Sequence, residues 1–276
     1  MARIAITGAA GAVGTVLRPE LLKLGYELTV TDLRPIANLD PSEAFLRADI
    51  LDHDSLVAAF EGCEAIIHLA ACTDAHADWP QQVSLSIVGT NNVLEAARVV
   101  GIKRVIYASS HHAVGLHPRN PPIDDRVTLR PDSRYGVGKA YGEVVGSYFA
   151  YKYDMRVLAI RIGNVNTKPI DRRRLGSWLS ARDLAQLVSI GIEKDGFVFQ
   201  VVYGNSDGSG RNYDNDAAYR LGYKPMDSSE GHDDRVLRED PLPEAGSVKA
   251  CLASEVSIGG AFSDHEFVGD VDRLYG

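Results

Sequence analysis

Three features of the 276-residue sequence predict an α/β fold built on a doubly wound parallel sheet. Short apolar segments alternate with segments of helical periodicity over residues 1–162, and this alternation implies parallel strands joined by right-handed crossovers. The apolar segments are nearly continuous runs, as in strands that helices cover on both faces. A glycine-rich turn separates the first strand from the first helix, which is the usual start of such a sheet.

The expected elements follow one another as strand, helix, strand. The first strand is expected at 4–7, where Gly8 interrupts an apolar run, and the first helix at 12–24, where Gly25 is a good helix stop. The other strands are expected at 27–31, 65–69, 104–109, 157–162 and 197–203, with one more ending at Asp49. The other helices are expected at 54–61, 80–100, 133–153 and 181–192.

Polar residues predict where two helices begin and where the alternation of strands and helices ends. Asp132 or Ser133 is expected to cap the helix at 133–153. Ser180 and Asp183 have the spacing of a capping box, with Asp in place of Glu or Gln. Residues 163–178 are polar and irregular, and residues 226–247, rich in Asp, Glu, Ser and Pro, are expected to form a loop.

The composition excludes several classes of protein. Hydrophobic residues make up 45% of the chain and charged residues 24%, as in ordinary globular proteins. The net charge of −8 argues against a nucleic-acid partner, which usually leaves a basic footprint. No apolar run is long enough to cross a membrane, the N-terminus has no secretion signal, and the three cysteines have no CxxC spacing. We therefore expect a soluble cytoplasmic protein without membrane contact.

The turn from Thr7 to Gly14 predicts a dinucleotide site. Gly8 permits the tight turn, Gly11 lets the backbone approach a pyrophosphate, and Gly14 lets the following helix pack on the sheet. Amide groups at the start of that helix then face the anion. The strand before the turn and the helix after it provide the context that such a motif requires.

Acidic residues at two strand ends bear on the choice of dinucleotide. Asp32 ends the second strand, where a carboxylate hydrogen-bonds the adenosine ribose and repels a 2′-phosphate, so NAD is favoured over NADP. Arg34 could offset part of that repulsion, but a solvated loop cation is the preferred interpretation. Asp49 could accept from the adenine amino group, or it could be a neighbour of a helix cap.

The spacing of Tyr135 and Lys139 predicts that a tyrosine acts as the catalytic base. Residues four apart lie on one helix face, and a nearby ammonium together with a positive nicotinamide would lower the pKa of a tyrosine, making it a base. Ser110 ends the fifth strand at the edge of the sheet where such folds bind ligands. The serine could hydrogen-bond a substrate hydroxyl beside the tyrosine.

Together these residues resemble the extended short-chain dehydrogenase/reductase family, of the NAD-dependent epimerase/dehydratase type. The resemblance also rests on His68-Leu69-Ala70-Ala71. It implies a Rossmann-like sheet in one domain, with an NAD-binding core at 1–165 and mostly substrate-binding segments, plus the last core helix and strand, at 166–276. It implies that Ser110, Tyr135 and Lys139 are catalytic. The implied cofactor-binding residues are Gly8, Gly11, Ala12, Val13, Gly14, Asp32, Asp49, Ile50, Leu69, Ala70, Ala71, Tyr135, Lys139 and Ile162.

A narrower resemblance is to uronate dehydrogenases and related sugar C1 dehydrogenases. The matching segments include 108–112, 161–163, 178–180, 221–225 and 259–262, and Arg173 lies five residues before Trp178. The residues that the resemblance implies for substrate binding are Thr73, Ser110, His111, His112, Arg173 and Phe262. His111 stands where those enzymes carry Asn, Thr73 where they carry Ser, and Ser86 where the wider family often carries Asn.

The resemblance implies NAD-dependent oxidation of a sugar at C1, first of all a hexuronate such as glucuronate or galacturonate. In the run Arg172 to Arg174, the spacing of Arg173 to Trp178 matches the family's substrate arginine and implies an anionic sugar, whereas Arg172 and Arg174 could equally be solvated loop cations. The alternatives are an aldose or sugar-phosphate 1-dehydrogenase, a sugar epimerase of the same family, and a non-catalytic NAD-binding protein. The histidines and cysteines show no metal-ligand spacing, so no metal is expected. We also expect a homo-oligomer.

Overall fold

The computed structural model describes residues 2–74, 76–208, 210 and 212–275. Its centre is a seven-stranded sheet in which every neighbouring pair is parallel, in the order β3-β2-β1-β4-β5-β6-β9. The strands are β1 (Arg3–Thr7), β2 (Glu27–Asp32), β3 (Ala44–Arg47), β4 (Ala65–His68), β5 (Arg104–Ser110), β6 (Arg156–Ile162) and β9 (Phe199–Gly204). The predicted doubly wound sheet is confirmed.

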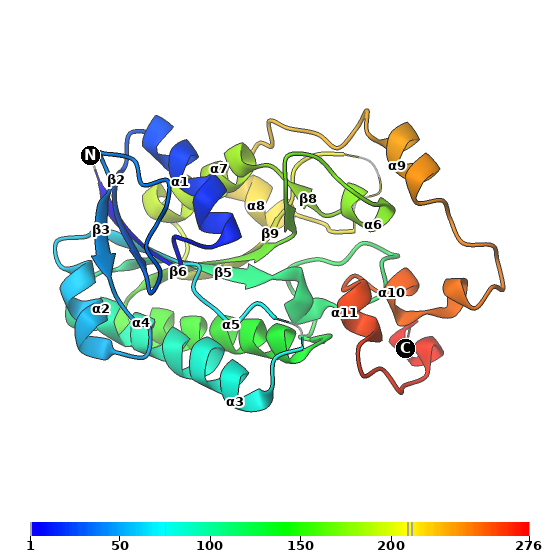
Figure 1. Ribbon diagram of the computed structural model, residues 1–276, viewed down its shortest axis with the longest axis horizontal. Coiled ribbons are helices and arrows are strands. Elements are labelled where there is room, and N and C mark those ends of the chain that lie inside the picture. The colour runs from blue at the N-terminus through cyan, green and yellow to red at the C-terminus, as the bar shows by residue number, and fades with distance from the viewer. Residues whose placement is uncertain (1, 75, 209, 211, 276) are drawn as a thin grey trace.

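Helices cover both faces of this sheet (Figure 1). One layer holds α1 (Ala12–Lys23), α7 (Ala181–Glu193) and α8 (Asp216–Arg220), and the other holds α2 (His53–Phe60), α4 (Gly89–Val99) and α5 (Arg134–Tyr153). Successive strand residues enter opposite cores, because side chains alternate along a strand. Ile4 and Ile6 pack toward α1 and α7, whereas Ala5 packs toward α2, α4 and α5.

Short elements, most of them from the C-terminal part of the chain, gather beyond the carboxyl end of the sheet (Figure 1). A two-stranded parallel ribbon lies there, formed by β7 (Asn164–Val165) and β8 (Trp178–Leu179). The short helices of this part are η2 (His111–Val114), α6 (Arg172–Leu175), α9 (Asp233–Glu239), η3 (Lys249–Cys251), α10 (Ala253–Val256), α11 (Ala261–Asp264) and η4 (Val271–Tyr275).

Two expected elements differ from the structure. The helix expected at 80–100 is three consecutive pieces, α3 (Trp79–Gln82), a π-helical turn η1 (Val83–Val88) and α4. A π turn holds one extra residue per turn, which apolar spacing does not reveal. The expected loop at 226–247 contains α9, because Val236 is fully buried and Asp233 and Asp234 occupy the first turn, where acidic residues favour a helix.

Serine side chains begin two of the core helices. Ser133, rather than Asp132, caps α5 by accepting a hydrogen bond from the Gly136 amide. Ser180 caps α7 through the Asp183 amide, as expected. The Asp183 carboxylate does not complete the box, since it accepts from the Ser206 hydroxyl and two amides of the 226–227 turn.

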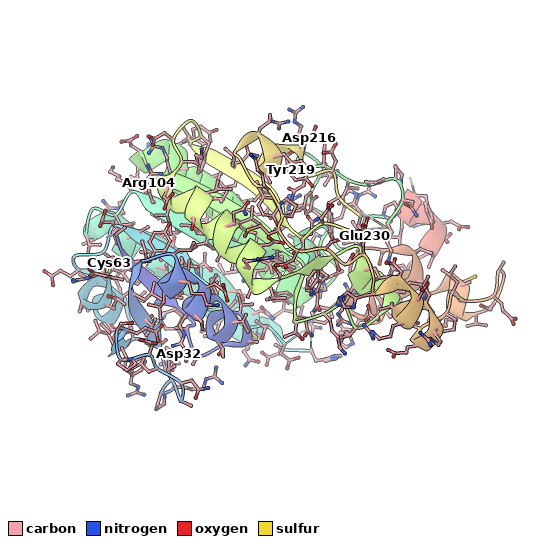
Figure 2. The ribbon with its side chains drawn as sticks, turned by 90° about the horizontal axis from the view of Figure 1, so that it is seen from above. Asp32, Cys63, Arg104, Asp216, Tyr219 and Glu230 are labelled. Atoms are coloured by element: carbon pink, nitrogen blue, oxygen red, sulfur yellow. The ribbon has the colours of Figure 1, made fainter. Side chains whose placement is uncertain are left out.

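The amino ends of the strands hold a cavity of about 680 Å³ that is lined in part by Cys63 and Arg104. Figure 2 shows both residues at the end of the molecule opposite the C-terminal segments. The motif residues instead follow the carboxyl ends of the strands, so this cavity is remote from them. No helix in the described part of the chain has both the length and the apolar character that a membrane crossing needs.

Candidate active site

The glycine turn between β1 and α1 opens into a cavity of about 460 Å³. Gly8 has a φ of +71°, and a Cβ on it would lie 2.6 Å from the Ala70 amide nitrogen, so no other residue fits this turn. Gly11 caps α1 without a side chain, which leaves the first amides of the helix open to a ligand. The cavity is lined by Gly8, Gly11, Ala12, Val13, Gly14, Thr31, Asp32, Leu33, Arg34, Ala48, Ile50, Leu69, Ala70, Ala71, Thr73 and Leu85.

Asp32 lies in the wall of this cavity at the end of β2. Its carboxylate accepts from the Ala10 and Arg34 amides, both at 3.0 Å, which holds it beside the glycine turn. The Arg34 guanidinium is 3.6 Å from the same carboxylate but is 71% exposed, as expected for a loop cation. Asp49 is not brought to the cavity, because its carboxylate accepts from the Leu51 amide in the turn before α2.

A second cavity of about 320 Å³ adjoins the first and shares Ala12, Val13, Leu69 and Thr73 with it. Ser110 reaches it from the end of β5, and Tyr135 and Lys139 reach it from the start of α5. The Ser110 hydroxyl is hydrogen-bonded to Tyr135. The Lys139 ammonium donates to the Ala108 carbonyl at 2.7 Å and lies 5.6 Å from the centre of the Tyr135 ring.

Burial changes the titration of the tyrosine and the lysine. Loss of solvent raises the pKa of Tyr135 to about 12, an effect that the Ser110 hydrogen bond opposes and the Asp132 charge reinforces. Burial also lowers the pKa of Lys139 to about 7. In the chain without a dinucleotide the burial of Tyr135 thus dominates its titration. The expected fall in its pKa includes the charge of the nicotinamide and stays a prediction. Additional positive charge is required before the tyrosine becomes a base near neutral pH.

The three consecutive arginines have different partners. Arg172 pairs with Glu255 at 2.8 Å, and Arg174 pairs with Asp171. Arg173 forms no ion pair with any described residue. It donates to the Ile258 carbonyl at 3.2 Å and to His111 Nε2 at 3.4 Å, and it lines the second cavity. Arg173 is thus the arginine of this run with free cationic capacity at the site.

Two histidines and a phenylalanine also line the second cavity. His112 stacks on Phe262 with ring centres 4.2 Å apart and meets the edge of Tyr135 at 5.6 Å. His111 and His112 are joined by a 3.1 Å contact between their Nε2 atoms. Asp132, a residue that the sequence indicated only as a helix cap, accepts from His112 Nδ1 at 2.6 Å.

The expected site residues other than Asp49 line one of the two cavities. The second cavity is lined by Ala12, Val13, Leu69, Thr73, Ala108, Ser109, Ser110, His111, His112, Tyr135, Lys139, Ile162, Gly163, Asn164, Val165, Arg173, Arg174 and Phe262. Leu85 of η1 also lines the first cavity, although no motif in the residues around it predicts this position. Within the described ranges, no group of three or more His, Cys, Asp or Glu side chains could hold a metal ion.

The model of the NAD dependent epimerase/dehydratase family matches residues 4–193. The chain belongs to this family. Among its epimerase/dehydratase relatives, a uronate dehydrogenase of Pseudomonas putida is 38% identical over 262 residues, which are 95% of each chain. An NAD-dependent glucose-6-phosphate dehydrogenase of Haloferax volcanii is 32% identical over 265 residues, 88% of this chain and 98% of the relative.

A solved structure supports the same comparison. It is a mutant of uronate dehydrogenase from Agrobacterium tumefaciens complexed with NAD. The two folds agree with a TM-score of 0.88 at 30% sequence identity, over 96% of this chain and 97% of that one.

Proposed function

We propose that the protein oxidises a hexuronate at C1 with NAD and forms the aldarolactone. The observation that carries this proposal is Arg173, a cation without a carboxylate partner in the described residues, in one cavity with Ser110, Tyr135 and Lys139. A guanidinium binds a carboxylate through two parallel hydrogen bonds. The relatedness to uronate dehydrogenases over nearly the whole chain supports this choice of anion.

The first cavity fits the cofactor. The Gly8 backbone and the open amides of α1 would hold the pyrophosphate, and the Asp32 carboxylate would hold the adenosine ribose. Lys139, in the second cavity, would hold the nicotinamide ribose. When bound, NAD would supply the acceptor for the hydride that C1 loses as it becomes the lactone carbonyl.

The residues of the second cavity would prepare the substrate for the loss of hydride from C1. The Tyr135 phenolate would take the proton of the anomeric hydroxyl, and the Ser110 hydroxyl would hold the same oxygen. Lys139, when protonated, places positive charge beside the Tyr135 ring and favours the phenolate. Arg173 and Phe262, both from the C-terminal segments, would hold the sugar at its far end.

The arginine run, taken by itself, favours a carboxylate over a phosphate. Arg172 and Arg174 already pair with Glu255 and Asp171, so the run of arginines offers one unpaired cation to the ligand. A phosphate carries close to two negative charges and is usually held by several cationic donors. A sugar phosphate remains the second candidate, since a relative of that activity covers most of the chain.

Replacing Arg173 by alanine should lower kcat/KM for the hexuronate by roughly 10- to 100-fold, the effect of losing one charge-assisted hydrogen-bonded pair in a dry site. The same change should alter kcat/KM for a neutral aldose by less than about threefold, because that sugar has no carboxylate to lose. Steady-state NADH production with both sugars measures the two effects.

Arg172→Ala is the matched control for that substitution. Arg172 is one residue away and pairs with Glu255, so its loss should not discriminate between the two sugars. An equal loss on both sugars with Arg173→Ala would contradict the carboxylate role. A wild-type protein that prefers a sugar phosphate would favour the second candidate.

NAD should be preferred over NADP, because the Asp32 carboxylate in the cavity wall would bind the ribose hydroxyls and repel a 2′-phosphate. Asp32→Ala should reduce the ratio of kcat/KM for NAD to that for NADP by roughly 10- to 100-fold. Arg34→Ala, a change to the neighbouring exposed cation, should instead raise that ratio slightly. A wild-type preference for NADP would show that the ribose is not bound in this way.

The expected homo-oligomer and cytoplasmic location stay predictions. An exposed row on α5, formed by Val144, Tyr148 and Tyr151, supports self-association, since these side chains are 59%, 51% and 71% exposed. Residues at this spacing share one helix face. A second copy of the chain is the occupant that would cover it.

A further inference from the structure

Four side chains form one continuous hydrogen-bonded chain along the wall of the second cavity. Arg173 Nη1 lies 3.4 Å from His111 Nε2, which lies 3.1 Å from His112 Nε2. The other nitrogen of His112, Nδ1, lies 2.6 Å from Asp132 Oδ2. The two ends of this chain have fixed roles, because a guanidinium only donates and an ionised carboxylate only accepts.

These fixed ends determine the protons between them. Arg173 donates to His111 Nε2, so that nitrogen carries a lone pair. The proton between the two rings must then belong to His112 Nε2. His112 Nδ1 must also carry a proton, since it faces the Asp132 carboxylate. His112 is therefore an imidazolium, and His111 is a neutral ring with its proton on Nδ1.

The surroundings of His111 agree with a neutral ring. Burial lowers the pKa of His111 well below its usual range, and the charges of His112, Arg173 and Arg174 lower it further. His111 Nδ1 is itself buried without a partner among the described residues. Among the described residues, Arg173 and His112 are therefore the hydrogen-bond partners of the His111 ring, and both contact Nε2.

The backbone makes room for the carboxylate that ends the chain. A Cβ on Gly115 or on Gly259 would come within 1.9 Å of Asp132 Oδ2. Asp132 Oδ1 accepts from the Ser133 hydroxyl at 2.7 Å, and its side chain is completely buried. Two segments far apart in the sequence, near residues 115 and 259, thus close around one carboxylate. A buried carboxylate in such a position requires a cationic partner.

We propose that Asp132 is a positioning residue that holds His112 as an imidazolium, so that the substrate cavity presents two cationic donors, His112 and Arg173. This inference rests on the proposed function for the identity of the anion. Both donors point to one lone pair, that of His111 Nε2. An anionic oxygen of the substrate placed beside this point would meet both positive groups.

The charged and titratable groups around His112 come from three helices and from the segment before α5. Asp132 precedes α5, Tyr135 belongs to α5, His111 to η2, and Arg173 to α6. Phe262 of α11 stacks on the ring and adds no charge. Asp132 is the anion hydrogen-bonded to the His112 ring. Removing the charge of Asp132 should therefore remove the second proton of His112.

Nitrogen NMR of histidine-labelled protein at neutral pH tests the proton pattern directly. His112, identified by the loss of its signals in a His112→Gln variant, should show both nitrogens protonated, and His111 only Nδ1. In Asp132→Asn, which keeps the shape of the side chain, His112 should show one protonated nitrogen. A wild-type His112 with one protonated nitrogen, or an unchanged His112 in Asp132→Asn, would overturn the proposal.

Kinetics test the role toward the substrate. Asp132→Asn should lower kcat/KM for the hexuronate roughly tenfold, mainly through KM, and change a neutral aldose by less than about threefold. Asp183→Asn is the matched control, a buried carboxylate remote from the cavities, and should lower Tm without changing the ratio between the two sugars. An equal loss on both sugars in Asp132→Asn would mean a structural role. Failure of the wild type to oxidise hexuronates would refute the proposed function, while the NMR result would stand by itself.

Discussion

Replacing Tyr135 by phenylalanine should lower kcat by about 10²- to 10⁴-fold, the usual contribution of a positioned acid or base. The substitution removes one oxygen atom, the atom that would take the proton from the anomeric hydroxyl. More Tyr135 phenolate forms at higher pH, because burial raises the pKa of Tyr135 to about 12, whereas Lys139, whose pKa burial lowers to about 7, loses its charge. The wild-type rate should therefore rise with pH only while Lys139 stays protonated. The residual rate of Tyr135→Phe should lack this rise.

The affinity for NAD and the substitution of a second tyrosine on the same helix provide the controls. The Kd for NAD, measured by calorimetry, should change little in Tyr135→Phe, since the glycine turn and Asp32 are untouched. Tyr141→Phe, on the same helix but outside both cavities, should keep the wild-type rate. A Tyr135→Phe protein with nearly wild-type kcat would show that another group takes the proton.

Replacing Arg161 by leucine should destabilise the fold by about 3–5 kcal/mol, because it leaves a carboxylate buried without its cation. The Arg161 guanidinium donates two hydrogen bonds to Glu143, both at 2.9 Å, and the two side chains are 3% and 5% exposed. The pair joins α5 to β6 two helical turns after Tyr135, and Ser109 donates to the same carboxylate. Chemical denaturation of the purified protein measures the loss.

Two controls test whether the loss of stability comes from the unpaired buried charge. One breaks an exposed ion pair, and the other replaces both members of the buried pair. Arg3→Leu breaks an ion pair with Glu27 that is 52% and 53% exposed, so the cost should stay below about 1 kcal/mol. Replacing Arg161 and Glu143 together by leucine should recover part of the lost stability, since no charge is then left unpaired. A loss below about 1 kcal/mol in Arg161→Leu would show that water reaches the Glu143 carboxylate.

Features that depend on neighbours in the chain were predictable from the residues alone. The alternation of apolar runs and helical periods predicted the parallel sheet, and the spacing of Tyr135 and Lys139 predicted one helix face. The glycine turn predicted the first cavity, because Gly8 and the strand and helix around it lie within a few residues. The two largest departures, η1 and α9, are a single widened turn and a short helix with one buried residue, and neither leaves a strong periodic signal.

Features that depend on contacts between distant segments required the folded chain. Three adjacent arginines look alike in sequence, yet Glu255 neutralises one and Asp171 another, which leaves Arg173 to the cavity. Residues near 115 and 259 enclose the Asp132 carboxylate that bonds His112, and the spacing of residues around Asp132 did not predict this contact. The rise in the pKa of Tyr135 also depends on the folded chain, because desolvation depends on everything packed around a group. Local spacing determines which side chains share a face, whereas charge balance and burial arise from partners that only the completed fold assembles.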